Sequence, residues 1–262
     1  MSAIITSIYN CPVKSISFQN IDKCKINKNI GIEGDRVFAF SQNLDLDQSK
    51  EFEKNPEARK GKWNKIVTLK NTPVFNKYNF LYENNKLTLT IKDKEIININ
   101  VNDSNERDNL VKKLIELEGS LKNDIRLMRN DEYPFYDTSI SNKSMFNNSI
   151  SLININSVRD FENKINRKIE ISTFRGNLYF DGMEAWEERN WIGKTLKINN
   201  VLFKVEKNIP RCVAINLKPK TDDNSFNLLK ILKQTYDHYD MGVYLTPEND
   251  GEINLSEKIH IK

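Results

Sequence analysis

The amino-acid sequence predicts a mainly β protein with a few helices, an α+β chain built around a barrel-like core. Many short apolar runs alternate with polar residues in the two-residue period of a half-exposed strand, most clearly over residues 15–28. Turns rich in Asn, Gly and Lys separate these runs. Helical spacing of apolar residues is confined to a few segments, and together these patterns favour a barrel.

In the first half of the chain the pattern predicts strands and one helix. The strands are expected at 3–9, 15–28, 36–42, 66–71, 86–93 and 95–101. Hairpin turns are expected at 83–87 and 92–95, between neighbouring strands. The helix is expected over 104–119, with Ser104 as its N-cap and Gly119 closing its end. Its apolar stripe consists of Leu110, Val111, Leu114, Ile115 and Leu117.

A polar, turn-rich stretch at 131–148 separates the two halves. We therefore expect one domain over 1–130 and a second over 131–262. In the second domain the pattern predicts a strand at 149–156, a capped helix at 157–167, a hairpin at 195–208, a helix at 227–236 and strands at 242–250 and 258–262.

The composition excludes several classes of protein. The 262 residues include 40 basic and 36 acidic ones, and the resulting net charge of +4 is too small to indicate a nucleic-acid partner, although it suits an anionic ligand. Three cysteines without a CxxC pair rule out a disulfide framework and a self-contained iron–sulfur module. Two histidines exclude a His-built metal site. Without a leader or an apolar run of about 20 residues, we expect a soluble cytoplasmic protein with no membrane span.

Three short segments carry the residues that could perform chemistry. Cys212 follows Pro-Arg, so it is either a buried structural thiol or a thiolate that binds a soft metal or attacks a substrate. Lys14 and Ser15 form an anion-contacting pair or a solvated strand end. Glycines beside Arg36 and beside Arg175 suit either ordinary turns or turns that present side chains to an anion.

Other motifs point away from nucleotides and sugars. The chain has no phosphate-binding P-loop, and GIEGDR lacks the third glycine of a dinucleotide fingerprint. The acidic stretch GMEAWEERNW is interpreted as structural, with Trp186 and Trp191 wedging a turn against the core. Its carboxylates are Glu184, Glu187 and Glu188.

With these residues in view, the chain resembles a known family along essentially its whole length. YNCPVKSI…GIEGDRVFAF resembles the start of a MOSC N-terminal β-barrel domain, which fits residues 1–130. The stretch from FRGN to NIPRC resembles the core of a MOSC domain, named for the C-terminus of the molybdenum cofactor sulfurase, which fits 131–262. By pattern it is similar to the mitochondrial amidoxime-reducing component and to bacterial MOSC proteins that reduce N-hydroxylated compounds.

The resemblance implies a molybdenum–molybdopterin cofactor, whose metal is bound by two dithiolene sulfurs and by one protein thiolate. Carried over to this sequence, the catalytic metal ligand is Cys212. The residues implied to hold the pterin and its phosphate are Lys14, Ser15, Arg36, Arg175, Asn177, Arg211 and Tyr244. Two positions depart from the family pattern: Cys11, and FNNS at 146–149, which leaves the roles of Asn147 and Asn148 open.

The resemblance also implies a reaction and its partners. The expected activity is two-electron reduction of N-hydroxylated bases, amidoximes or hydroxylamines by a monomeric enzyme. Since the sequence ends without a cysteine cluster, we expect electrons from a separate flavoprotein reductase, ferredoxin or cytochrome. The alternative is a non-catalytic carrier that holds sulfur or the cofactor at Cys212, and a third reading is a β-barrel binding module without a metal.

Overall fold

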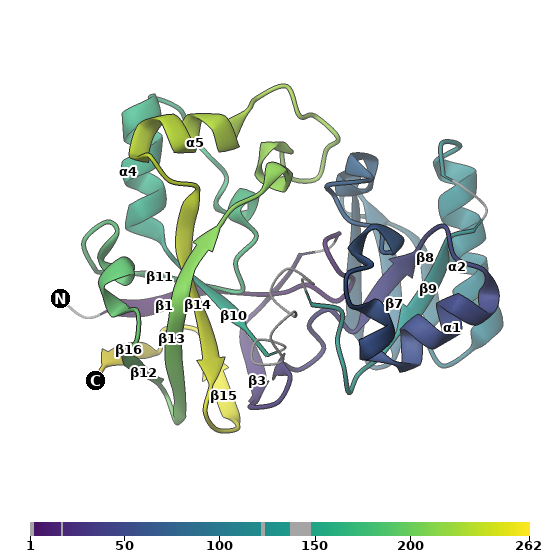
Figure 1. Ribbon diagram of the computed structural model, residues 1–262, viewed down its shortest axis with the longest axis horizontal. Helices are drawn as coiled ribbons and strands as arrows, with labels where there is room; N and C mark the ends of the chain where they lie inside the picture. Colours follow the sequence, from purple (N-terminus) through teal and green to yellow (C-terminus); the bar gives the residue numbers. More distant parts are fainter. Residues whose placement is uncertain (1–2, 17, 122–123, 137–147) are drawn as a thin grey trace.

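The computed structural model describes residues 3–16, 18–121, 124–136 and 148–262. Two lobes lie side by side in Figure 1: a barrel lobe, and a second lobe that carries α1 (Leu46–Lys54) and α2 (Ser104–Leu117). The predicted fold class, mainly β with a few helices and a barrel, is confirmed. None of the helices in the described ranges is long and apolar enough to cross a membrane.

In the described chain, seven strands close into the barrel. In spatial order they are β11 (Leu178–Asp181), β10 (Ile150–Asn154), β14 (Asp240–Pro247), β13 (Val201–Pro210), β12 (Thr195–Ile198), β16 (Lys258–Ile261) and β1 (Ala3–Asn10). The antiparallel pairing of β1 with β11, which sets Ile5 opposite Phe180, closes the ring. A cluster of buried hydrophobic residues forms its core, and the Phe180 and Trp191 rings meet there at 5.2 Å between centroids.

Short strands extend the barrel at its edges. The strand β2 (Gln19–Ile21) pairs with β1. A separate small sheet is formed by β15 (Gly251–Asn254), β3 (Lys23–Asn27) and β4 (Gly31–Ile32). Two helices, α4 (Ile155–Ile165) and α5 (Leu228–Tyr236), lie together at one end of the barrel lobe (Figure 1). Their N-caps are the amides of Asn154 and Asn227.

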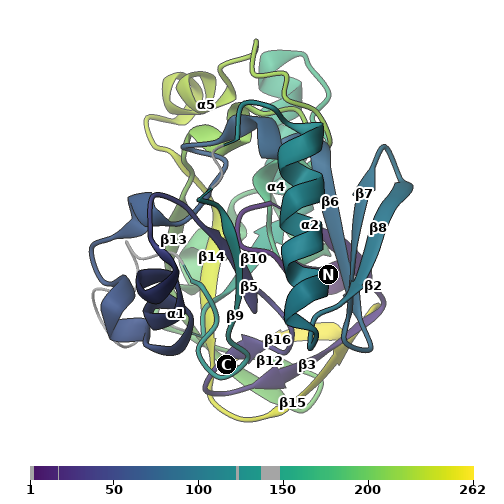
Figure 2. The ribbon, with the colours of Figure 1, turned by 90° about the vertical axis from the view of Figure 1, so that its right-hand side faces the viewer.

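The second lobe contains two small sheets around its own core. One sheet pairs β5 (Phe38–Ser41) with β9 (Arg126–Arg129), and the other contains β6 (Tyr78–Glu83), β7 (Lys86–Ile91) and β8 (Lys94–Asn100). The predicted hairpin turns are confirmed, because the residue pairs 84–85 and 92–93 all have the positive φ of a two-residue turn. Figure 2 shows α2 alongside these strands, and its buried face contains Leu110 and Leu114.

Short 3₁₀ turns connect the main elements. They span Pro56–Arg59, Trp63–Lys65, Pro73–Lys77, Ile171–Phe174, Glu187–Trp191 and Val213–Asn216.

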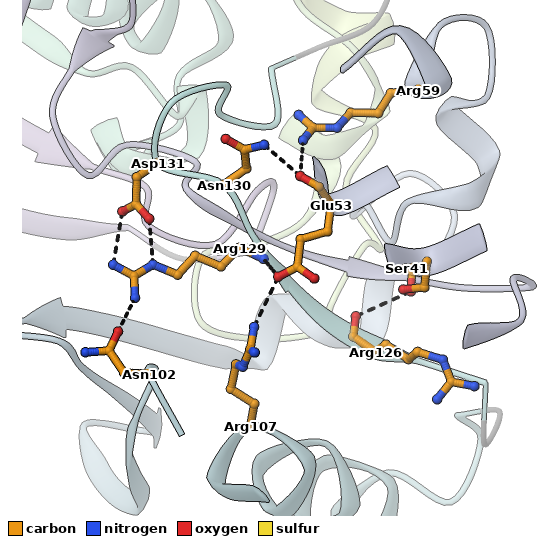
Figure 3. Close-up of polar contacts among 10 residues, drawn as sticks. Ser41, Glu53, Arg59, Asn102, Arg107, Arg126, Arg129, Asn130 and Asp131 are labelled. Atoms are coloured by element: carbon orange, nitrogen blue, oxygen red, sulfur yellow. Dashed lines mark hydrogen bonds and ion pairs between the residues drawn. The ribbon is translucent and has the colours of Figure 1, made fainter. Parts of the chain in front are cut away.

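A polar network holds the second lobe together around Glu53 (Figure 3). The backbone carbonyl of Glu53 accepts hydrogen bonds from Arg59 Nη2 at 2.9 Å and from Asn130 Nδ2 at 2.7 Å. Its carboxylate oxygen Oε1 accepts from Arg107 Nη1 at 3.1 Å and from the backbone N–H of Arg129 at 2.9 Å. The end of α1 is thus tied to α2, to β9 and to the segment that follows β9.

The structure corrects several local expectations. Residues 66–71 are not a strand, since Ile66 makes only an isolated bridge to Ser41. The N-cap of α2 is Asp103, whose carboxylate accepts from two backbone N–H groups, and not Ser104, which is the first helical residue. Glu118, one residue before Gly119, takes the C-cap position. Finally, β1 belongs in space to the barrel that residues 150–261 otherwise form, although its sequence falls within 1–130.

Candidate functional site

The segment after β1 places Lys14 and Ser15 beside the second lobe. The backbone N–H of Lys14 donates to Phe38 O at 2.8 Å, and Phe38 N donates to Pro12 O at 3.0 Å. These two bonds fix the turn that begins at Pro12. The Lys14 side chain is buried, and Ser15 has a φ of 63°, a left-handed conformation that is uncommon for residues other than glycine.

The GIEGDR turn presents a buried ion pair to this segment. Asp35 is 2% exposed, and its Oδ1 accepts from the backbone N–H of Cys11 at 2.7 Å. Asp35 Oδ2 forms an ion pair with Arg36, which has a φ of 54°. Burial lowers the pKa of Arg36, but the Asp35 carboxylate more than offsets it and raises that pKa above its usual value. Arg36 therefore stays charged at any pH at which the protein folds.

The FRGN turn brings Arg175 and Asn177 to the same place. Arg175 has a φ of 52°, and its Nη2 donates to Ser15 O at 2.8 Å. The Asn177 side chain is 1% exposed and bonds to neighbouring segments of the protein. Its Oδ1 accepts from Ser151 Oγ at 2.8 Å, and its Nδ2 donates to Tyr9 O at 3.3 Å.

At the end of β13, Arg211 is fastened to the neighbouring backbone and Cys212 is exposed. Arg211 Nε donates to Met241 O at 2.9 Å, and its Nη1 donates to Phe174 O at 2.6 Å. Cys212 is the N-cap residue of the turn Val213–Asn216 and has an exposed side chain. The reading of Cys212 as a buried structural thiol is therefore wrong.

Tyr244 lies in the middle of β14, opposite Ser151 of β10 and Lys207 of β13. Two residues earlier, Gly242 has a φ of +81°, and a Cβ there would collide with the carbonyl oxygen of Leu152. Glycine is required at this position because β14 approaches β10 so closely.

Electrostatic contacts join these turns into one site, which we call the basic cluster: Lys14, Arg36, Arg175 and Arg211. Arg175 interacts with Arg36 and also with Cys212. Arg211 interacts with both Cys212 and Tyr244, and Tyr244 interacts with Arg36. Burial lowers the pKa of Arg175 and that of Arg211. The residues predicted to hold a cofactor thus converge from far-apart parts of the chain, while their ligand-binding roles stay predictions.

Three further residues lie at the site: Asp35 and Tyr136, which were not predicted, and Cys11, which the sequence left as either a bystander or a nearby second thiol. Asp35 and Cys11 are buried at its base, and burial raises the pKa of the Cys11 thiol against the opposing charge of Arg175. The Tyr136 ring lies 5.7 Å from the Arg36 guanidinium carbon. The sequence signal for Asp35 was its place between Gly34 and Arg36, whereas Tyr136 had none, because a turn over 100 residues away in sequence presents it.

The departures from the family pattern have different outcomes. Asn147 lies outside the described residues. Asn148 Nδ2 donates to the backbone carbonyl of Lys28. The described residues contain no group of three or more His, Cys, Asp and Glu side chains that could hold a metal ion by themselves.

Two cavities adjoin the cluster. One, of about 460 Å³, lies between the lobes and is lined by Arg175 of the cluster and by Ala214, two residues after Cys212. The other, of about 640 Å³, lies beside Tyr136 and Asn148.

A protein-family model matches part of the chain. The family model described as MOSC domain matches residues 137–260, which include Arg175, Asn177, Arg211, Cys212 and Tyr244 but not Lys14, Ser15 or Arg36. No curated protein sequence matches.

Among solved structures, the chain is similar to the YuaD protein from Bacillus subtilis at 10% identity, with a TM-score of 0.44 over 100% of this chain and 96% of that one. It is also similar to YiiM from Geobacillus stearothermophilus (18% identity, TM-score 0.35) and to YiiM from Escherichia coli (14%, 0.32). Each YiiM match covers 43% of this chain and 53% of the other.

Proposed function

Given the MOSC-domain match over residues 137–260, we propose that the protein is a molybdenum-cofactor-dependent reductase of N-hydroxylated compounds. The observation that supports this best is the exposed thiol of Cys212, which interacts with the guanidinium groups of Arg175 and Arg211. An exposed cysteine can reach a metal, and cysteine binds metals through its sulfur as a thiolate.

The donor set fits the cofactor. A thiolate is a soft ligand of the kind that suits molybdenum in a sulfur environment. Two cations of the basic cluster, Arg36 and Lys14, act on the buried carboxylate of Asp35, and the surplus of positive charge in the cluster suits a pterin phosphate. Ser15, Arg36 and Arg175 all have left-handed backbones, a strain that concentrates at ligand-binding turns.

Different residues of the chain would bind different parts of the cofactor. Cys212 would bind the metal, whose remaining ligands come from the cofactor. Lys14, Ser15, Arg36, Arg175 and Tyr244 would contact the pterin and phosphate. Arg211 and Asn177 position the surrounding backbone, since Arg211 donates to two different backbone carbonyls, where Arg175 donates to one, and Asn177 is buried and donates to Tyr9 O. Arg211 thereby positions the residue that follows it.

In the proposed reaction the substrate N–O bond breaks, and a hydroxylamine takes up two electrons and two protons to give an amine and water. The bound cofactor supplies the electrons. The guanidinium groups of Arg175 and Arg211 keep the surroundings of Cys212 positive, which favours uptake of negative charge. Because the Cys212 side chain faces solvent, water supplies the protons.

Electrons reach the site from a separate redox protein, which we propose to be a flavoprotein reductase, a ferredoxin or a cytochrome. Beside Cys212, the side chains of Val213 and Tyr239 are 45% and 44% exposed, and Lys233 lies over the Tyr239 ring at 5.6 Å. An apolar contact bordered by a lysine suits transient docking of an acidic partner. Full turnover from NADH alone, with no added protein, would contradict this part of the proposal.

The test is metal analysis and turnover of protein made in a host that synthesises molybdopterin. We expect stoichiometric molybdenum in the wild type and its loss in Cys212→Ser, with the buried Cys24→Ser as the matched control that keeps it. With dithionite as reductant, the wild type should reduce hydroxylamine and Cys212→Ser should not. Stoichiometric molybdenum without turnover would instead establish the carrier role, which an exposed thiol also suits, and absence of molybdenum would overturn both.

A further inference from the structure

We propose that the outer wall of the barrel over β12, β13 and β16 is the docking face for the electron donor, and that this donor is an acidic redox protein of the ferredoxin type. The inference rests on the proposed function and adds to it the place and the charge of the partner. The face, which we call the basic wall, carries four exposed lysines: Lys197, Lys204, Lys207 and Lys258. Figure 1 shows β12 and β16 at the end of the barrel lobe opposite α4 and α5.

Lysines dominate the solvent side of these three strands. Leu196 and Phe203 are fully buried in the barrel core. Lys197 and Lys204, each next in sequence to one of them, are exposed, as expected for strands with one face on the core. The structure describes β12, β13 and β16 in full, and Glu206 is the one carboxylate among their residues. The whole chain has 40 basic and 36 acidic residues, so the basic wall departs from its balance of charge.

Strand pairing sets the lysines of the basic wall next to one another. Lys197 lies opposite His260 of β16 and opposite Leu202 of β13. Lys258 and Lys204, each two residues from one of those partners, are therefore diagonal neighbours of Lys197 on the same face. The one carboxylate of these strands lies 3.6 Å from Lys204 and offsets part of the repulsion between the lysines. A partner with negative charge would relieve the rest.

The strand β13 leads from the basic wall to the candidate site. Lys207 lies opposite Tyr244 of β14, and its Nζ is 6.0 Å from the centre of the Tyr244 ring. On its other side Tyr244 lies opposite Ser151, whose hydroxyl donates to Asn177 Oδ1 at 2.8 Å. Five residues after Lys207, the chain reaches the exposed Cys212. A protein docked on the basic wall can therefore extend along β13 to the exposed thiol.

The charge and the apolar end of this face match a ferredoxin. The backbone N–H of Arg211, just after β13, donates to the carbonyl oxygen of the exposed Tyr239 at 2.9 Å, so the apolar contact beside Cys212 continues from the basic wall. Complementary charges steer such a partner and speed its association. Ferredoxins combine an acidic surface with one redox group near it. Each reduced ferredoxin gives one electron, so two encounters supply the two electrons that cleavage of the N–O bond consumes.

The experiment measures hydroxylamine reduction by the holoenzyme with a reduced [2Fe–2S] ferredoxin as electron donor. Lys204→Glu/Lys207→Glu reverses two charges of the basic wall, and Lys50→Glu/Lys112→Glu, at exposed positions of the second lobe, is the matched control. At low salt the wall variant should lower kcat/KM for ferredoxin at least about tenfold, and the control should behave like the wild type. The difference should shrink as NaCl is raised to about 0.5 M, because salt screens exposed charges. With dithionite as reductant, both variants should turn over like the wild type.

Equilibrium binding separates failure of this inference from failure of the proposed function. Ferredoxin should bind the wild-type protein and bind the wall variant at least about tenfold more weakly, whether or not the protein turns over, and the basic cytochrome c should not bind. Equal binding of ferredoxin by the wall and control variants, or binding no stronger than that of cytochrome c, would overturn the inference while leaving the reductase proposal intact. Binding of anionic lipid vesicles or duplex DNA by the wall lysines in place of ferredoxin would do the same. Absence of dithionite-driven hydroxylamine reduction would overturn the reductase proposal alone.

Discussion

The guanidinium of Arg211 donates from Nε to the carbonyl oxygen of Met241 at 2.9 Å, although the two residues are 30 positions apart in the sequence. The same side chain donates from Nη1 to Phe174 O at 2.6 Å. The residue that precedes the exposed thiol is thus joined both to the start of β14 and to the residue before Arg175, so the positions of Cys212 and Arg175 depend on one planar fork.

Replacing Arg211 by lysine removes that fork while keeping its charge. We expect Arg211→Lys to lower the free energy of unfolding by about 2 kcal/mol, because one ammonium cannot reach both carbonyls. Urea unfolding measures the change. Arg159→Lys, in an exposed ion pair with Asp181, is the control and should cost less than about 1 kcal/mol. Equal effects of the two variants would contradict a positioning role for Arg211.

The three cysteines differ in their accessibility in the folded protein. Cys212 is exposed, whereas Cys11 and Cys24 are buried, and burial raises the pKa of Cys24 to about 12. Brief treatment of the cofactor-free protein with iodoacetamide, followed by peptide mass spectrometry, should show alkylation at Cys212 alone, and all three sites should react in urea. Rapid alkylation of Cys11 in the native protein would show that the base of the cluster is open to solvent.

Two glycines with left-handed backbones allow the energetic cost of close packing to be measured separately from the cost of backbone strain. At Gly242 an added Cβ would meet Leu152 O and would lie 2.9 Å from Ile153 Cγ1, whereas at Gly61 no heavy atom lies within 4 Å. We expect Gly61→Ala to cost about 1 kcal/mol of stability through strain alone. Gly242→Ala should cost at least about 3 kcal/mol, since β14 must move away from β10. Thermal unfolding of both variants tests the difference, and similar costs would mean that the strands can separate freely.

Arg59 stabilises the segment that places Tyr136 next to Arg36. Its guanidinium donates to Phe52 O at 2.6 Å and to Tyr133 O at 2.7 Å, and it lies over the Phe135 ring at 4.0 Å. Arg59→Met should lower the free energy of unfolding by about 3 kcal/mol, because several backbone carbonyls lose their donor. The neighbouring Lys60→Met, at an exposed ion pair, should cost less than about 1 kcal/mol in the same denaturation experiment. A cost for Arg59→Met as small as that of the control would refute the fastening role.

Acid pH should weaken the turn that contacts Arg211. His238 Nδ1 accepts from the backbone N–H of Asp240 at 3.1 Å, and burial, together with the charge of Arg189, lowers its pKa below 6.5. The unfolded chain binds a proton at His238 more readily than the folded chain. The contribution of neutral His238 to the free energy of unfolding is therefore complete above the His238 pKa of the unfolded chain, and it is lost as the pH falls through the His238 pKa of the folded protein. The surrounding Lys233, Asp237 and Asp240 also act on this ring.

Proton NMR titration checks this expectation, because the chain has only two histidines and His238→Gln identifies the signal. The His238 resonance should titrate below 6.5. A midpoint above that value would mean that the protonated ring is the favoured form in the folded protein.

The spacing of apolar residues predicted helices and strands whose buried residues recur at a regular interval. It missed segments that are stabilised by local contacts or by contacts on both faces. The helix α1 has only two apolar residues, Leu46 and Phe52, and Leu46 is 50% exposed. Its start is set by a capping box between Asp45 and Gln48. Residues 66–71 were predicted as a strand, but Ile66, Val67 and Leu69 are buried while Lys70 and Asn71 are exposed, so burial in the segment does not follow a two-residue period.

The sequence could single out residues that the fold brings together, but not what each side chain contacts. Glycines next to arginines marked the two turns that meet, whereas the position of Cys212 after Pro-Arg left open whether it is a structural thiol or a ligand. Sequence alone could not show that Arg175 lines the cavity and donates to Ser15 O, or that Arg211 donates to Met241 O and Phe174 O. These contacts depend on which carbonyl groups the fold brings within reach, and those groups come from distant segments.

The pairing of β1 with β11 and β16 has a consequence during synthesis. The partners of Ile4 are Asp181 and Lys258, so β1 must wait until residue 258 has been synthesised before both of its edges are covered. Until then it is an apolar strand with unsatisfied backbone groups, the kind of segment on which chaperones act and at which nascent chains aggregate. The second lobe, whose strands pair within residues 38–129, can form while that strand is still waiting.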